Sequence, residues 1–204
     1  MKNVTTKICI AILVLLMTTT IKAQTFNPNL AKMLQDTLNL FNSFPSTKGV
    51  SVSVTCPGQG IWVGTGGLSY SGVPVSSDMV FPLASNSKLF TAVTLLKLQE
   101  DNLLDLDNPI SMYLPTYNNV NPSITIRQLL NHTSGVADPF ANQLFLDSLN
   151  AAPSRLWTPV EVLSWVGVPT FVAGTNFTYS NTNYILAGMV AQSVTGFHIS
   201  KLIC

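Results

Sequence analysis

A serine and a lysine stand three residues apart where a long apolar run begins. This arrangement limits both the fold and the chemistry that the chain can have. They are Ser85 and Lys88, and the apolar run extends from Leu89 to Leu98. Apolar positions on every face of this run predict a helix buried in the middle of a domain. Residues three apart share a helix face, so the Lys88 amine can reach the Ser85 hydroxyl, and the positive end of the helix favours negative charge there. This geometry is typical of an activated nucleophile.

The serine and lysine pattern also has an ordinary interpretation. A serine that opens a helix is a common N-cap. A chain of this composition contains about one S-x-x-K match by chance, so the pattern alone is weak evidence. Whether Ser85 is a nucleophile or a cap therefore depends on which other motifs the chain contains.

The first 23 residues have the layout of a secretory signal peptide. Lys2 and Lys7 precede an apolar run over residues 8–17, and Ala23 ends the segment. This run is shorter than the roughly 20 residues that a membrane-spanning helix needs. We therefore predict a signal peptide over residues 1–23, a domain over residues 24–204, export to the periplasm or the medium, and no stable membrane insertion after cleavage. An uncleaved anchor is the alternative.

The composition narrows the class of protein. Hydrophobic residues make up 47% of the chain, charged residues only 9%, and the formal net charge is +1. One compact domain with a real core is expected, and neither nucleic-acid binding nor binding to an anionic membrane has electrostatic support. The only histidines, His132 and His198, lack ligand spacing, so no metal site is expected. We interpret Cys56 and Cys204 as free thiols, with a bridge between them as the alternative.

The first part of the mature chain reads as a helix followed by a hairpin. Apolar residues recur at helical spacing over residues 29–44. Alternating valines predict a strand over Gly49–Cys56, and residues 61–64 read as the returning strand. We interpret the glycines of residues 64–67 as turn glycines, because the segment lacks a complete phosphate-binding motif.

The chain from Ser85 onward is predicted to be mainly helical. Thr125 is expected to cap one short helix, Pro159 to open another, and residues 182–194 to form the last, with Gly196 beyond it. The fold class is therefore α+β. No linker or repeat marks a second independent domain.

Tyr179 and Asn181 precede the last helix and stand two residues apart. On an extended segment such residues point the same way, so both side chains could line one wall of a pocket. In the alternative interpretation, Asn181 is an N-cap and Tyr179 is a core aromatic residue. A rival match, Tyr117-Asn118-Asn119, lies in an Asn-rich and Pro-rich loop, where a turn explains it better.

Three ordered motifs resemble those of the serine β-lactamase and penicillin-binding-protein superfamily, in its class C β-lactamase-like and D-alanyl-D-alanine carboxypeptidase-like branch. Residues 85–88 match S-x-x-K, residues 129–135 match L-L-x-H-T-S-G, and residues 179–181 match Y-x-N. A related set that contains S-x-x-K is known for other members of this superfamily. The resemblance runs from about Val50 to Gly196.

The resemblance implies acyl transfer through a covalent serine ester, with no cofactor. Ser85 would attack a carbonyl, Lys88 would help to remove its proton, and Tyr179 would pass that proton to the leaving group and later activate water. Asn181 would bind the substrate amide, and His132 would give structural support. The implied substrates are small molecules or peptides: β-lactams, D-Ala-D-Ala peptides or small esters. The oligomeric state stays open.

The third motif of this superfamily, K-T-G or H-x-G, does not occur after Tyr179. The resemblance implies a β-lactamase/transpeptidase-like fold with helices packed on an antiparallel sheet, and we expect this chain to lack the C-terminal strands and one oxyanion donor. An exposed sheet edge, uncovered apolar helix faces and weak activity would follow. The alternative function is that of a non-catalytic remnant or a binding protein of the same fold.

Overall fold

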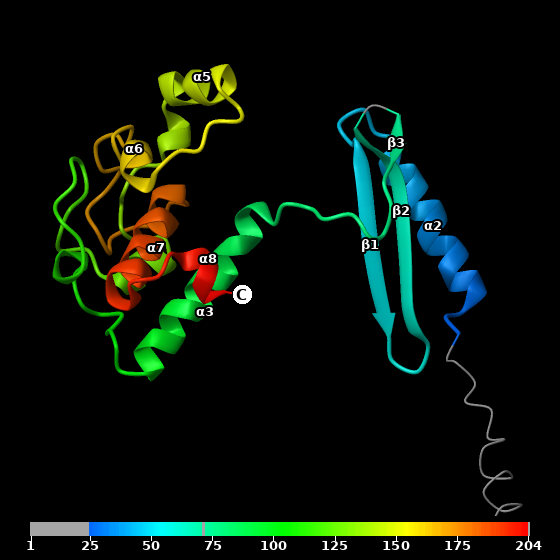
Figure 1. The fold of residues 1–204 in the computed structure, drawn as a ribbon, viewed down its shortest axis with the longest axis horizontal. Helices are drawn as coiled ribbons and strands as arrows, with labels where there is room; N and C mark the ends of the chain where they lie inside the picture. The colour runs from blue at the N-terminus through cyan, green and yellow to red at the C-terminus, as the bar shows by residue number, and fades with distance from the viewer. Residues whose placement is uncertain (1–24, 71, 204) are drawn as a thin grey trace, which may run out of the picture. The chain divides into compact units, whose positions relative to one another are not determined.

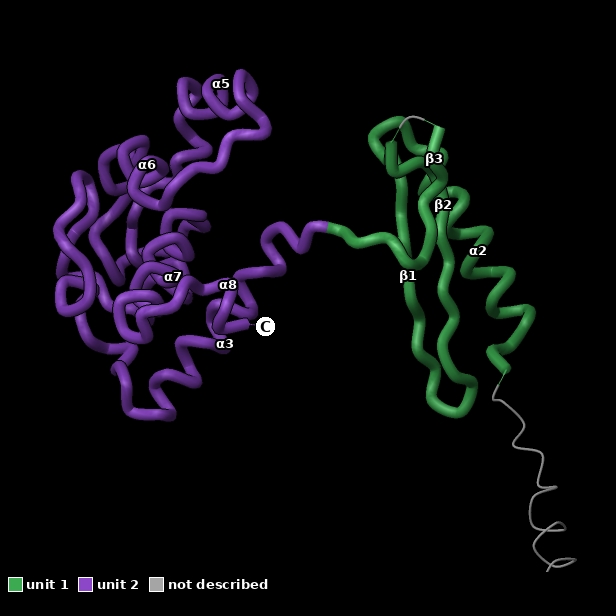
Figure 2. Tube along the Cα trace, viewed as in Figure 1, with its two compact units in different colours: residues 1–81 green, residues 82–204 purple. Residues whose placement is uncertain are grey.

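The computed structural model describes residues 25–70 and 72–203. The predicted signal peptide and Cys204 lie outside the described residues. The chain divides between Phe81 and Pro82 into two compact units, unit 1 and unit 2, each of which is described by itself (Figure 2). The fold is α+β, as the sequence predicts, with a small antiparallel sheet in unit 1 and mostly helices in unit 2 (Figure 1).

Unit 1 consists of one helix packed on a three-stranded antiparallel sheet. Helix α2 (Pro28–Asn42) begins at the N-cap Asn27. The strands are β1 (Gly49–Cys56), β2 (Gly60–Tyr70) and β3 (Val73–Pro74), in the order β1-β2-β3. The predicted helix and hairpin are thus confirmed, and β1 has the predicted bounds. Among the described strands, β1 is an edge strand that pairs only with β2. Cys56, at the end of β1, is a free cysteine.

The glycines of residues 64–67 were predicted to form a turn, and this prediction is wrong. They lie inside β2, where Gly64 pairs with Val52 and Gly66 pairs with Val50. The physical reason is the close approach of α2. A Cβ atom on Gly66 would lie 2.7 Å from Cδ2 of the buried Leu38 on α2, so a larger residue there would require the Leu38 side chain to move.

Unit 2 is mainly helical, as predicted from Ser85 onward. Two α-helices of fourteen and fifteen residues, α3 and α7, are joined by shorter elements. The elements are η1 (Ala84–Asn86), α3 (Ser87–Glu100), η2 (Ile110–Met112), α4 (Ile126–Leu130), η3 (Pro139–Ala141), α5 (Gln143–Ala151), α6 (Pro159–Leu163), α7 (Asn181–Thr195) and α8 (Ile199–Leu202).

The helix ends of unit 2 follow the local capping chemistry that the sequence predicts. Thr125 and Gln128 form a capping box at the start of α4. Pro159 occupies the first turn of α6. Gly196 ends α7 in the left-handed conformation, with φ 75°. The capping box pairs backbone N–H groups at the start of α4, Pro159 has no N–H group that would need a partner, and the Gly196 N–H donates to the Gln192 carbonyl at the end of α7.

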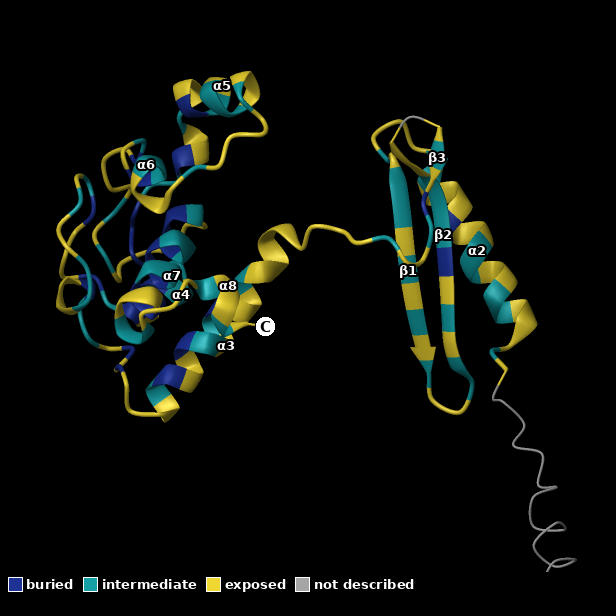
Figure 3. Cartoon of the chain, viewed as in Figure 1, coloured by how far each residue is buried: buried dark blue, intermediate teal, exposed yellow. Residues whose placement is uncertain are grey.

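Helix α7, rather than α3, is the buried centre of unit 2 (Figure 3). Leu186 and Val190 of α7 are fully buried and share one core cluster with Leu95 and Leu98 of α3. The sequence predicts a buried α3, and unit 2 by itself covers one face of this helix. Its apolar residues occur all around the helix, but α7 packs against one face only. On the opposite side, unit 2 leaves side chains such as Leu89 exposed, at 67% for Leu89.

The close approach within unit 1 gives a first prediction. A Cβ atom on Gly67 would lie 2.9 Å from the Cα of Gly49 and still closer to the Lys48 carbonyl oxygen, and φ at Gly67 is 74°. We expect Gly67→Ala to destabilise unit 1 by about 2 kcal/mol, because left-handed strain and overlap with backbone add together. Amide hydrogen exchange in β1 and β2 measures the effect.

The matched control for this substitution is Gly72→Ala. Gly72 has a similar φ of 77°, but a Cβ atom there meets nothing within 4 Å. This control carries the left-handed strain without the overlap, so it should accelerate exchange less than Gly67→Ala does. Equal effects of the two substitutions would contradict the close approach.

Candidate active site

Ser85 lies in a tight turn immediately before α3. It belongs to the 3-10 turn η1, and Asn86 rather than Ser85 is the N-cap of α3. The preceding residue, Ala84, has a φ of 46°, which costs a non-glycine residue about 1 kcal/mol and is a kind of strain that clusters at functional sites. The hydroxyl of Ser87 donates to the Ala84 carbonyl at 2.7 Å and supports the turn. The alternative interpretation of Ser85 as a cap is therefore wrong.

The Ser85 hydroxyl meets two of the predicted partners. Its Oγ lies 3.0 Å from the hydroxyl oxygen of Tyr179, and Lys88 Nζ donates a hydrogen bond to Oγ at 3.2 Å. Lys88 Nζ also lies 5.0 Å from the centre of the Tyr179 ring. Residues 94 positions apart in the chain thus form one cluster within unit 2.

Asn181 joins the same cluster through Lys88. Lys88 Nζ donates to Asn181 Oδ1 at 2.8 Å, and the Tyr179 hydroxyl lies 3.4 Å from the same oxygen. The N-cap of α7 is Ser180, so the alternative interpretation of Asn181 as a cap is wrong. Tyr179 is 43% exposed, which also excludes it as a core aromatic residue. The structure brings all four predicted site residues together.

The surroundings of Tyr179 favour its charged form. The Lys88 ammonium lowers the pKa of the Tyr179 hydroxyl most, and the hydrogen bond with Ser85 lowers it further. Burial and the carboxylate of Asp138 raise this pKa, but by less, so the net effect is a lowered pKa for Tyr179. A phenol with a lowered pKa is a better proton acceptor near neutral pH, because more of it is present as tyrosinate.

His132 supports the cluster by contacts with the segment that carries Tyr179 and with the first turn of α7. Its Nδ1 accepts the backbone N–H of Ser180 at 3.2 Å and lies 3.0 Å from the Asn183 amide nitrogen. Two donors at Nδ1 require that this atom carries no proton, and burial lowers the pKa of His132 in agreement. The neutral ring lies 4.6 Å from the Tyr179 ring, so it packs against the phenol.

Two residues of this cluster were not predicted from the sequence. Asp138 accepts hydrogen bonds from both the backbone and the side chain of Asn181. Asn183 holds His132 and accepts the hydroxyl of the buried Ser134. The Asp138-Pro139 pair is a typical start of a 3-10 turn and could have drawn attention to Asp138. Asn183 sits inside a helix pattern and carries no such signal.

The rival tyrosine and asparagine pair lies elsewhere. Asn119 has a φ of 59°, and its amide donates to the Val166 carbonyl at 2.8 Å. Tyr117 packs against the hydrophobic core. This segment is a turn, as the sequence analysis favoured.

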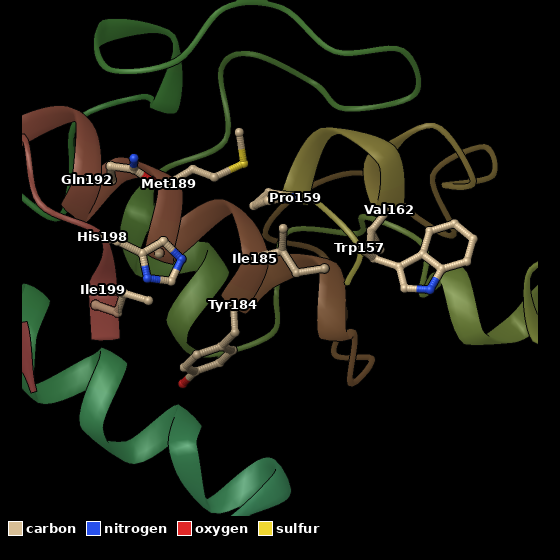
Figure 4. A pocket seen from close by; sticks show the side chains of 10 residues that line it. Trp157, Pro159, Val162, Tyr184, Ile185, Met189, Gln192, His198 and Ile199 are labelled. Carbon is tan, nitrogen blue, oxygen red and sulfur yellow. The ribbon is translucent and has the colours of Figure 1, made fainter. Parts of the chain in front are cut away.

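A separate, mostly apolar pocket of about 310 Å³ lies between α6, α7 and α8 (Figure 4). Tyr184 lines it, and the same ring lies 5.4 Å from His132. None of the four predicted site residues lines this pocket. It is therefore distinct from the cluster around Ser85.

Within residues 25–70 and 72–203, no three side chains of the His, Cys, Asp or Glu type gather as they would around a metal ion. No helix in the described part of the chain has the length and apolar character needed to cross a bilayer.

Comparisons with known proteins agree with this fold. Residues 39–202 match the family model Beta-lactamase. A D-stereospecific amidohydrolase from Streptomyces sp. has a TM-score of 0.74 and 31% identity, over 85% of this chain and 52% of that one. A D-amino acid amidase from Ochrobactrum anthropi SV3 has a TM-score of 0.72 and 29% identity, over 86% and 48%. Penicillin-binding protein 4* of Bacillus subtilis is 33% identical over 64% of this chain and 28% of its own length.

The fold and the matched sequence define a protein of the β-lactamase/transpeptidase superfamily. The chain belongs to the beta-lactamase family. It spans about half the length of the similar solved structures and about a quarter of the length of the curated relatives.

The position of Lys88 gives a prediction for Tyr179. We expect Lys88→Met to raise the pKa of Tyr179, because the positive charge that stabilises the tyrosinate is lost while the length of the side chain is kept. Titration of the ring carbon resonance of Tyr179 by NMR measures this pKa.

The control for this titration is Lys97→Met on the same helix. Lys97 forms ion pairs with Glu100 and Asp101 instead of meeting the cluster, so its loss should leave the titration of Tyr179 in place. An unchanged pKa of Tyr179 in Lys88→Met would show that the two groups are not neighbours in solution.

Proposed function

We propose that this protein is a serine hydrolase or acyltransferase that works through an acyl-serine intermediate. The single observation that carries the proposal is the position of Ser85 Oγ, 3.0 Å from the Tyr179 hydroxyl and 3.2 Å from Lys88 Nζ. A serine hydroxyl is too weakly acidic to attack a carbonyl unaided. A tyrosinate within hydrogen-bond distance, held beside a cation, supplies the missing base.

Each group has a distinct role in the reaction. Ser85 Oγ forms a bond to the substrate carbonyl carbon while its proton passes to the Tyr179 oxygen. Lys88 helps to remove this proton, because its ammonium stabilises the tyrosinate and donates to Ser85. When the tetrahedral intermediate collapses, Tyr179 returns the proton to the leaving group. The same tyrosinate then activates the water that hydrolyses the ester.

Two further groups bind the substrate in this proposal. The backbone N–H of Ser85 is one donor to the developing oxyanion, and such a contact is often worth about 3 kcal/mol. The Asn181 amide nitrogen carries two protons, and its bond to Asp138 at 2.9 Å uses one of them. The second proton is left to donate to a substrate amide.

The proposed reaction and the similar proteins support a class of substrate. Acyl-serine chemistry suits β-lactams, D-Ala-D-Ala peptides and small esters. Two similar solved structures are named as a D-stereospecific amidohydrolase and a D-amino acid amidase, which supports a small amide of a D-amino acid as the substrate. We further propose that the protein is exported and acts in the periplasm or outside the cell.

The proposal predicts covalent labelling of one serine. We expect a fluorescent penicillin to add its mass to the chain, and Ser85→Ala to abolish this addition because the nucleophile is gone. Mass spectrometry of the intact chain and of its peptides measures both the yield and the modified residue.

The matched control is Ser148→Ala in α5, whose hydroxyl donates to a backbone carbonyl within its own helix. This variant should label like the parent chain. A parent chain that binds penicillin reversibly without any covalent addition would instead identify a non-catalytic binding protein.

A further inference from the structure

We propose that Asp138 is a positioning residue that fixes the orientation of the Asn181 amide and thereby directs the Lys88 ammonium toward Ser85. This inference rests on the function proposed above. It assigns a role to a residue outside the three sequence motifs.

The orientation of the Asn181 side chain decides whether Lys88 has an acceptor. A primary amide has one end that accepts hydrogen bonds and one end that only donates them. Lys88 Nζ lies 2.8 Å from the Oδ1 end of Asn181. If the amide were reversed, its NH₂ group would face an ammonium, and two donors would meet without an acceptor.

Asp138 selects the correct orientation. Its Oδ2 accepts the Asn181 side-chain nitrogen at 2.9 Å and the Asn181 backbone nitrogen at 3.1 Å. An ionised carboxylate has only acceptors, so the NH₂ end of Asn181 must face it. The oxygen end then faces Lys88, which in turn donates to Ser85 Oγ.

The carboxylate of Asp138 is itself held in place. Its Oδ1 accepts the backbone N–H of Phe140 at 3.0 Å and caps η3. The neighbouring carbonyl of Ala137 accepts the hydroxyl of the buried Thr182 on α7 at 2.7 Å. Asp138 and Asn181 are therefore joined both directly and through the start of α7, so the orienting group does not depend on one flexible side chain.

The negative charge of Asp138 and its positioning of Asn181 have opposite effects on the rate of Ser85 acylation. The titratable and charged groups near Tyr179 are Lys88, Asp138, His132 and Tyr184, and the neutral polar groups at its hydroxyl are Ser85 and Asn181. The negative charge of Asp138 raises the pKa of Tyr179, against the effect of Lys88. Loss of that charge alone would therefore favour the tyrosinate and speed up acylation. Loss of the orientation of Asn181 would slow it down.

The test is Asp138→Asn in the full chain, with the rate of Ser85 acylation by a fluorescent penicillin as the readout. Asparagine is as good a cap as aspartate, so η3 should be kept. Its NH₂ group then competes with the donors of Asn181. We expect acylation to slow by about 10- to 100-fold, because a misplaced catalytic group typically costs this much. A rate equal to or above that of the parent chain would overturn the proposal.

A double substitution shows whether Asp138 acts through Asn181. When Asn181 is already alanine, Asp138→Asn should change the acylation rate by less than about 2-fold, because the intermediary is missing. An undiminished loss in that background would overturn the proposal. The control is Asp107→Asn, an aspartate in the same unit that pairs with Arg127 and should leave the rate unchanged.

A second readout does not need acylation and separates this inference from the proposed function. Hydrogen bonding to a carboxylate shifts the side-chain NH₂ resonances of Asn181 in NMR spectra. Asp138→Asn should move them and Asp107→Asn should not. If the parent chain is not acylated, the proposed function fails, while these resonances still decide the positioning role: an unmoved pair in Asp138→Asn overturns it.

Discussion

The ammonium of Lys88 is the group around which the site of unit 2 is arranged. Its hydrogen bonds run to Ser85 Oγ and Asn181 Oδ1, and it lies over the Tyr179 ring. Each partner gains from the same charge: the hydroxyl is fixed, the phenol is easier to ionise and the amide has a donor for its oxygen. Without this cation, Ser85 Oγ and Asn181 Oδ1 would lose the donor that they share.

Packing between two helices places this cation. Leu95 and Leu98 of α3 share a core cluster with Leu186 and Val190 of α7. Lys88 lies near the start of α3 and Asn181 begins α7, so apolar burial sets the distance over which their side chains meet. Lys88 and Asn181 are therefore held at the starts of two packed helices of one unit, and Ser85 and Tyr179 lie in the segments just before them, an arrangement that suits preorganised chemistry.

Local chemistry predicts much of this structure, and long-range contacts account for the rest. The cap at Thr125 depends on residues next to it in the chain, and the order of the motifs is a property of the sequence itself. Both could therefore be predicted. The position of the glycines inside β2 could not be predicted, because these glycines make room for α2, a helix more than twenty residues away in the chain. The Asp138-Pro139 pair indicates a local turn, but the contact of Asp138 with Asn181 could not be predicted, because Asn181 lies 43 positions along the chain. Which face of α3 packs on α7 could not be predicted either, because apolar residues occur on every face of α3.

The most direct measurement of the central claim is a crystal structure of the chain at a resolution that separates the side chains of unit 2. The account predicts that Ser85 Oγ lies about 3 Å from both the Tyr179 hydroxyl and Lys88 Nζ, with Asn181 Oδ1 as the second acceptor of the ammonium. A Tyr179 hydroxyl well beyond hydrogen-bond distance of Ser85, with Lys88 turned to solvent, would contradict it.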